Sequence, residues 1–89
     1  MKTIWKYKFG IKDIVTITLP KDAEILFVKR EFDLFFLYAL VDTENDLEDR
    51  YIEVVGTGQE VHCDIDTERK FIGTVQEPPF IWHIFERIP

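Results

Sequence analysis

Eight uncharged residues follow one another in the middle of the chain: Leu34-Phe35-Phe36-Leu37-Tyr38-Ala39-Leu40-Val41. A strand with one face in water alternates apolar and polar residues, and this run does not alternate. It therefore predicts a β-strand that is covered on both faces. The cover is either the rest of the domain, with the strand in the centre of a small barrel, or another subunit.

The N-terminal segment, by contrast, alternates with a period of two residues. Trp5, Tyr7 and Phe9 fall on one face of an extended chain, and Lys6 and Lys8 fall on the other. This pattern is typical of a half-buried strand. We expect its aromatic side to face the core and its basic side to face water.

Similar signals predict strands along the rest of the chain. The β-branched run 14–19 ends at Pro20, and the connection 10–13 indicates a hairpin between this run and the first strand. Further strands are expected at 24–29, 51–55, 71–75 and 80–85, with a bulge or a close backbone approach at Gly73. Seven short strands, with turns about every 8–12 residues, indicate an all-β fold class. We expect a small antiparallel sandwich or a partly open barrel that forms one domain over residues 1–89.

Two segments between these strands lack a strand pattern. Residues 42–49 carry five acidic side chains and are expected to form an exposed loop. Residues 59–69 form the longest irregular segment.

The composition favours a folded cytoplasmic protein without a membrane partner. Of the 89 residues, 46% are hydrophobic and 31% are charged, which is too apolar for a disordered chain and too charged for a membrane span. Residues 1–8 lack the hydrophobic core of an export signal, and the single cysteine, Cys63, fits a reducing compartment. Aromatic residues make up 15% of this small chain and must supply its core, so self-association is expected as well.

The charge balance excludes one class of partner. The net charge of −6 and the pI near 4.8 argue against duplex nucleic acid, whose binding needs clustered Lys and Arg. The average conceals an asymmetry, because Lys2, Lys6, Lys8 and Lys12 all precede the first acidic residue, Asp13. A small anionic ligand could therefore bind beside the N-terminal strand.

Catalysis has little support in the residues. The chain contains no serine, and its single thiol, Cys63, has no apparent general base. His62, Cys63 and the distant His83 do not have the spacing of a zinc site. We therefore expect no enzyme, no catalytic residue, no metal and no cofactor.

The candidate binding residues begin at a glycine-containing turn. Gly56-Thr57-Gly58-Gln59 ends an expected strand. Successive backbone N–H groups in such a turn can bind a phosphate, although an ordinary strand-end turn has the same sequence signal. His83, on the last expected strand, is either a core residue or a ligand contact.

Aromatic and basic residues complete the candidate site. Trp5 and Trp82 could stack on a flat ring or could belong to the core. Lys6, Lys8 and Arg50 would meet the negative charge of the ligand. This arrangement requires the N-terminal strand to lie next to the glycine turn.

Six short motifs lie along the chain in this order: Lys2-Thr3-Ile4-Trp5-Lys6-Tyr7, Ala23-Glu24-Ile25-Leu26, Tyr38-Ala39-Leu40-Val41-Asp42, Val55-Gly56-Thr57-Gly58, Phe71-Ile72-Gly73-Thr74 and Trp82-His83-Ile84-Phe85. Together they resemble a family of short phage and prophage proteins classed as a domain of unknown function. The likeness covers nearly the whole chain, and Gly-Thr-Gly and Trp-His are its most specific parts. The family often has histidine after Gly-Thr-Gly, where this chain has Gln59. The resemblance implies a phage origin and a compact β-rich fold, and it brings no established activity.

Phages also carry small oligomeric proteins that trap host immune signals such as cyclic nucleotides or ADP-ribose derivatives, for example the Sequestin and Lockin families. The chain is similar to these proteins in type, by its size, its cytoplasmic character and its lack of catalytic residues. The first hypothesis is a homo-oligomer that binds and sequesters a small nucleotide-derived signal in the cytoplasm of an infected bacterium. The alternative is a protein–protein interaction module, a phage accessory or host-inhibitor protein, that uses an exposed β edge or residues 42–49.

Overall fold

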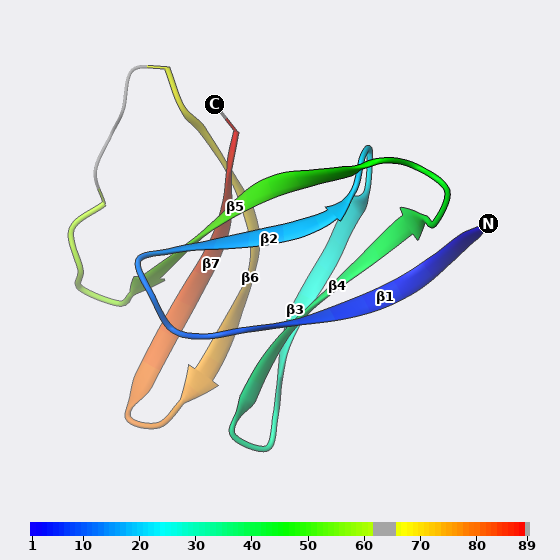
Figure 1. Cartoon of the computed structure of the whole chain (residues 1–89). Helices are drawn as coiled ribbons and strands as arrows, with labels where there is room; N and C mark the ends of the chain where they lie inside the picture. The colour runs from blue at the N-terminus through cyan, green and yellow to red at the C-terminus, as the bar shows by residue number, and fades with distance from the viewer. Residues whose placement is uncertain (62–65, 89) are drawn as a thin grey trace.

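Antiparallel strands make up the fold in the computed structural model, which describes residues 1–61 and 66–88 (Figure 1). Within these ranges there are seven strands: β1 (Lys2–Phe9), β2 (Ile14–Pro20), β3 (Glu24–Glu31), β4 (Leu34–Asp42), β5 (Leu47–Gly56), β6 (Glu68–Glu77) and β7 (Phe80–Ile88). Every pairing between neighbouring strands is antiparallel. In the described part of the chain, no helix is present that could cross a membrane.

The strands form two sheets. The three-stranded sheet has the order β1-β4-β3, and the four-stranded sheet has the order β2-β5-β7-β6. The apolar sides of both sheets meet in a shared core, which includes Leu37 from β4 and Ile52 and Ile84 from the other sheet, all fully buried. The prediction of an all-β antiparallel sandwich is therefore confirmed, and among the described strands the sheets do not close into a barrel.

The expected hairpin between the first two strands is wrong. Strand β1 pairs with β4 from Lys2 opposite Asp42 to Phe9 opposite Phe35, whereas β2 pairs with β5 in the other sheet. Residues 10–13 carry the chain from one sheet to the other. Turn signals report only that the chain reverses. The choice of partner depends on distant packing, such as the contact between the Phe9 and Phe35 rings, whose centroids are 6.1 Å apart.

Strand β4 alternates in burial although its sequence does not alternate in polarity. Phe35, Leu37, Ala39 and Val41 face the core and are at most 4% exposed. The other side chains of the strand, Leu34 among them, point away from the core and are partly or largely exposed. The chain therefore covers one face of this strand. Within residues 1–61 and 66–88, no segment supplies the predicted cover on the second face.

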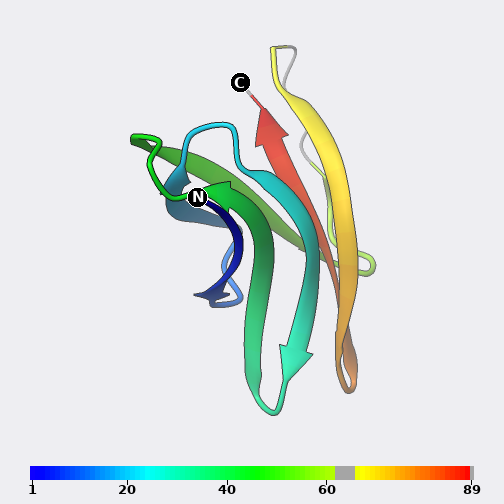
Figure 2. The ribbon, with the colours of Figure 1, turned by 90° about the vertical axis from the view of Figure 1, so that its right-hand side faces the viewer.

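Strands β3 and β6 run side by side and join the two sheets along one edge (Figure 2). Gly73 faces Val28 there, and a Cβ atom on residue 73 would lie 3.0 Å from Val28 Cγ2. Arg30 Nη1 donates a hydrogen bond of 3.1 Å to the Gln76 carbonyl oxygen. The register of β6 against β7 shifts between Phe71 and Gly73, so the predicted bulge is confirmed.

The acidic segment is more ordered than expected. Strand β5 begins at Leu47, so residues 43–46 form the turn and the later acidic residues belong to a strand. Asp49 accepts a 2.6 Å hydrogen bond from the Thr18 hydroxyl, and Glu48 accepts a 3.1 Å bond from the Asp22 amide. A charge run alone does not reveal such partners on a neighbouring strand.

Candidate functional site

The Gly56–Gln59 turn is closed by its own hydrogen bonds. The Gln59 side-chain oxygen accepts a 2.7 Å bond from the Gly56 amide, and the Gln59 amide donates to the Gly56 carbonyl at 3.0 Å. The Thr57 amide donates to the Ile81 carbonyl at 3.1 Å. Three amides expected to receive a phosphate are therefore engaged within the protein. The expectation of a bare anion-binding nest is corrected accordingly.

Trp82 lies directly against this turn. Its register partner across the sheet is Gly56, and the indole packs on that glycine so closely that a side chain there would collide with it. On β7 the Phe80 ring stacks with the indole, with centroids 5.5 Å apart and planes inclined by 24°. The indole Nε1 donates a long, 3.4 Å bond to Glu77. Trp82 is thus held in place by a glycine, an aromatic ring and a carboxylate.

A pocket of about 480 Å³ opens between the turn and the start of β7. This turn pocket is lined by Gly56, Thr57, Gln59, Pro79, Phe80, Ile81 and Trp82. Its volume lies within the range of small-molecule sites, and none of the described residues that line it is charged. The pocket therefore suits an uncharged, partly apolar group.

His83 supports the turn from the neighbouring position. Its Nε2 lies 2.7 Å from the Thr57 hydroxyl, and its Nδ1 lies 3.3 Å from the Thr74 hydroxyl. Because successive residues of a strand point to opposite faces, His83 and Trp82 hold the turn from two sides. His83 thus contacts Thr57, which itself lines the turn pocket.

The structure thus gathers six of the ten predicted site residues at one end of the four-stranded sheet and places the other four elsewhere. The gathered residues are Gly56, Thr57, Gly58, Gln59, Trp82 and His83. Sequence reasoning missed Pro79, Phe80 and Ile81, which line the same pocket. The signal for them was the Pro78-Pro79 turn directly before an aromatic residue. This turn reverses the chain, so the start of β7 lies at the end of the sheet where the pocket is.

The N-terminal residues belong to the other sheet. Lys6 Nζ lies 3.2 Å from Glu31 and 4.4 Å from the centre of the Phe36 ring, and Lys8 shares this outer side of the three-stranded sheet. Trp5 lies on the inner side of β1, opposite Ala39, and is 42% exposed. The lysines and the glycine turn are therefore on different sheets, contrary to the arrangement that the sequence suggested.

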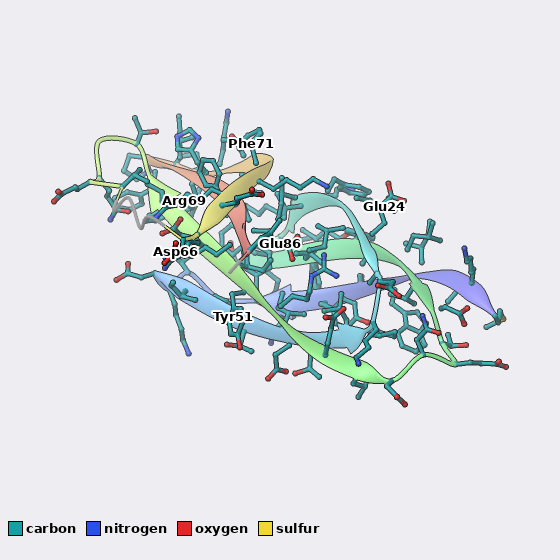
Figure 3. The ribbon with its side chains drawn as sticks, turned by 90° about the horizontal axis from the view of Figure 1, so that it is seen from above. Glu24, Tyr51, Asp66, Arg69, Phe71 and Glu86 are labelled. Atoms are coloured by element: carbon teal, nitrogen blue, oxygen red, sulfur yellow. The ribbon has the colours of Figure 1, made fainter. Side chains whose placement is uncertain are left out.

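Arg50 is part of a buried ion pair near the opposite end of β5. Its Nε and Nη2 atoms donate to the Glu86 carboxylate, and its Nη1 donates to the Ala23 carbonyl at 2.9 Å. Glu86 reaches from β7 into the interior and is only 6% exposed (Figure 3). The hydrogen bond to Glu86 raises the pKa of Arg50, so the guanidinium stays charged. Arg50 is therefore engaged within the fold and lies away from the Gly56–Gln59 turn.

A second buried pair was not foreseen. On the outer side of the four-stranded sheet, Arg69 Nε and Nη2 donate to the carboxylate of Glu53, which is 9% exposed. Arg69 comes from β6 (Figure 3). The one sequence signal for this pair is a single acid, Glu53, inside the apolar run 52–55.

No metal centre is apparent among residues 1–61 and 66–88, where no group of three His, Cys, Asp or Glu side chains gathers. His62 and Cys63 lie outside the described residues.

The fold and the turn pocket define a small two-sheet β domain with a ligand-sized, uncharged pocket at one end of its larger sheet. Comparison with protein families places the chain further. A family model for a domain of unknown function, DUF7352, matches residues 1–89, and the chain belongs to this family. No curated protein and no solved structure matches the chain.

Proposed function

We propose that this domain is a non-catalytic binding protein that captures a small molecule carrying a planar ring in the turn pocket. The observation that carries the proposal is the packing of Trp82 on Gly56 beside an open pocket of about 480 Å³. Phe80 is 54% exposed and offers an aromatic surface at the mouth of the pocket. Planar rings pack favourably against such surfaces.

The lining of the pocket favours binding of the base of a nucleotide over binding of its phosphate. Gln59 uses its side-chain oxygen on the Gly56 amide, which leaves its side-chain nitrogen to donate to a ligand. The Thr57 hydroxyl is a second polar group at the same wall. With no cation among the described residues of the lining, a phosphate would extend from the pocket into water. We therefore expect affinity to depend weakly on salt.

In this proposal the ligand is a nucleotide-derived signal, and the protein acts by sequestering it. The role corresponds to that of phage proteins of the Sequestin and Lockin type, in the cytoplasm of an infected bacterium. The six motifs quoted above support the phage origin, and the uncharged, aromatic lining supports a nucleobase as the bound group.

Calorimetric titration tests the proposal with a panel of nucleosides, cyclic mononucleotides, cyclic dinucleotides and cyclic ADP-ribose isomers. We expect at least one base to bind, both as the nucleoside and as the nucleotide. The Phe80→Ala variant should lose at least tenfold in affinity, because it removes the exposed ring of the pocket. The matched control is Phe71→Ala on β6, since Phe71 is 57% exposed and does not line the pocket. Silence across the panel, or equal loss in both variants, would refute the proposal.

A second candidate is the protein–protein interaction module, which the edge position of β1 favours. Strand β1 has β4 as its only hydrogen-bonded neighbour among the described strands, so its other edge can accept an extended segment of a partner. The exposed Glu44 and Asp46 offer a test of the acidic turn. Reversing both charges should abolish the binding of a partner protein at this turn and leave ligand binding in the turn pocket unaffected.

A further inference from the structure

One side of the three-stranded sheet carries a row of apolar side chains between charged neighbours. On β4 four apolar side chains point away from the core, and Ile4 on β1 and Phe27 on β3 lie opposite two of them. This outer face consists of Ile4, Phe27, Leu34, Phe36, Tyr38 and Leu40. Ile4 is 56% exposed, Leu34 45% and Phe27 44%. Contiguous apolar surface of this kind marks interaction sites on soluble proteins.

Two of the aromatic rings on the outer face cover one face of each other. Phe27 and Tyr38 lie opposite each other on adjacent strands, and their rings stack with centroids 4.6 Å apart and planes within 9°. The Phe36 ring is covered by Lys6 Nζ at 4.4 Å. The bases of single-stranded nucleic acid need exposed ring faces for stacking, so a protein surface fits this face better.

The charge of the outer face suits a second copy of the chain. The whole chain has a net charge of −6, so two copies repel each other over most of their surface. The outer side of the three-stranded sheet is nearly neutral by comparison. Its strands direct four lysines and three carboxylates to this side: Lys2, Lys6, Lys8, Lys29, Glu24, Glu31 and Asp42. Contact through this side therefore brings two copies together where repulsion is smallest.

We infer that the protein is a dimer in which the outer faces of two copies pack on each other. The interface is isologous, so each residue of the face meets the same surface on its partner. In the dimer, the partner covers the second face of β4, as the uncharged run 34–41 predicts. It goes beyond the proposed function, because the turn pocket lies on the other sheet and stays open in the dimer.

Light scattering after size-exclusion chromatography tests the inference at chain concentrations up to about 200 μM, where a dimer with micromolar affinity is populated. The full chain should elute with twice its mass of 10.6 kDa. The double variant Ile4→Lys with Leu34→Lys should elute as a monomer, because both side chains are exposed and lie at the outer face. The matched control Phe71→Lys, on the other sheet, should remain a dimer. Circular dichroism checks that each variant is folded.

Four outcomes overturn the inference. The first is a full chain that stays at monomer mass at all of these concentrations. The second is a dimer that persists in the folded double variant, and the third is a dimer that dissociates in the Phe71→Lys control instead. A fluorescent oligothymidylate that binds the full chain as a monomer, with Phe36→Ala abolishing the binding, assigns the face to single-stranded nucleic acid and overturns the dimer.

Discussion

The indole of Trp82 packs on the backbone of Gly56, and a Cβ atom on residue 56 would lie 2.9 Å from its Cζ3 atom. The two residues are register partners on β7 and β5. Gln59 also crowds the same position, at 3.3 Å. The absence of a side chain at residue 56 therefore fixes both the place of the indole and the closure of the turn that borders the pocket.

Replacing Gly56 by alanine should displace the indole. The new methyl group would collide with Trp82 Cζ3, and relief of such overpacking typically costs about 1–3 kcal/mol of stability. Gly56→Ala in a Trp5→Phe background, where Trp82 is the sole indole, should shift the tryptophan emission and lower the midpoint of urea unfolding.

Gly58 provides the comparison for this substitution. It has a φ of 90°, and a Cβ atom there would meet nothing within 4 Å. Gly58→Ala should therefore cost about 1–2 kcal/mol through backbone strain alone and leave the Trp82 emission unchanged. An emission shift that is larger in Gly58→Ala than in Gly56→Ala would contradict the packing described above.

The Arg50–Glu86 pair should contribute far more to stability than the exposed Lys6–Glu31 pair. Glu86→Ala leaves a mostly buried guanidinium without its carboxylate, and such losses cost roughly 3 kcal/mol when one partner keeps some exposure, as Arg50 does at 19%. Lys6→Ala removes a partner that is 50% exposed and should cost less than about 1 kcal/mol. Chemical denaturation measures the loss of unfolding free energy in both variants. Equal losses would show that burial does not determine how much an ion pair contributes to stability.

The close contact between β3 and β6 should make Gly73 and Val28 energetically coupled. Gly73→Ala would push against Val28 Cγ2 and lower the free energy of unfolding by about 1–2 kcal/mol. In a Val28→Ala background the space exists, so the same substitution should cost much less. A double-mutant cycle measures the coupling, and strictly additive effects would refute the contact.

Acid should remove one stabilising interaction at the outer face. Hydrogen bonds from the Tyr38 hydroxyl and then from Lys6 lower the pKa of Glu31. A carboxyl group with a lowered pKa stabilises the fold above its ordinary value, near 4.3, and this stabilisation disappears as the pH falls through the folded-state value. Glu31→Gln should therefore destabilise the protein at about pH 6 and lose this effect as the pH falls below the folded-state pKa of Glu31.

Tyr38, the hydrogen-bond partner of Glu31, should affect the stability of the protein at alkaline pH instead. Its pKa is raised by the hydrogen bond to Glu31, so its contribution is complete below the ordinary tyrosine value and is lost as the pH rises through the folded one. A constant cost of Glu31→Gln across the acid range would contradict the assigned hydrogen bonds.

Strand positions could be predicted because side-chain alternation is a local property. The aromatic side of β1, Trp5, Tyr7 and Phe9, does face inward, and the Gly73 bulge lies where the glycine interrupts its strand. Which strands pair was not predictable, because the partner of β1 is β4, about thirty residues away, and the turn at 10–13 looks like that of a hairpin. Pairing depends on long-range burial.

The candidate site was predictable in part for the same reason. The Gly56–Gln59 turn and Trp82 converge because β5 and β7 are neighbours, which no local pattern shows. Arg50 carries the charge expected of a ligand contact, but Glu86 engages it in the interior. The sequence shows which chemical groups are available, whereas the fold decides which partner each group contacts.

The most direct test of ligand capture follows the two indole N–H resonances in a ¹H–¹⁵N NMR titration with the base that binds in calorimetry. Trp82 borders the pocket, and Trp5 lies on the other sheet. The account predicts that the Trp82 signal moves in a saturable way, together with the amides of Thr57 and Phe80, while the Trp5 signal stays in place. Movement of Trp5 alone, or no movement of Trp82 at saturation, would contradict it.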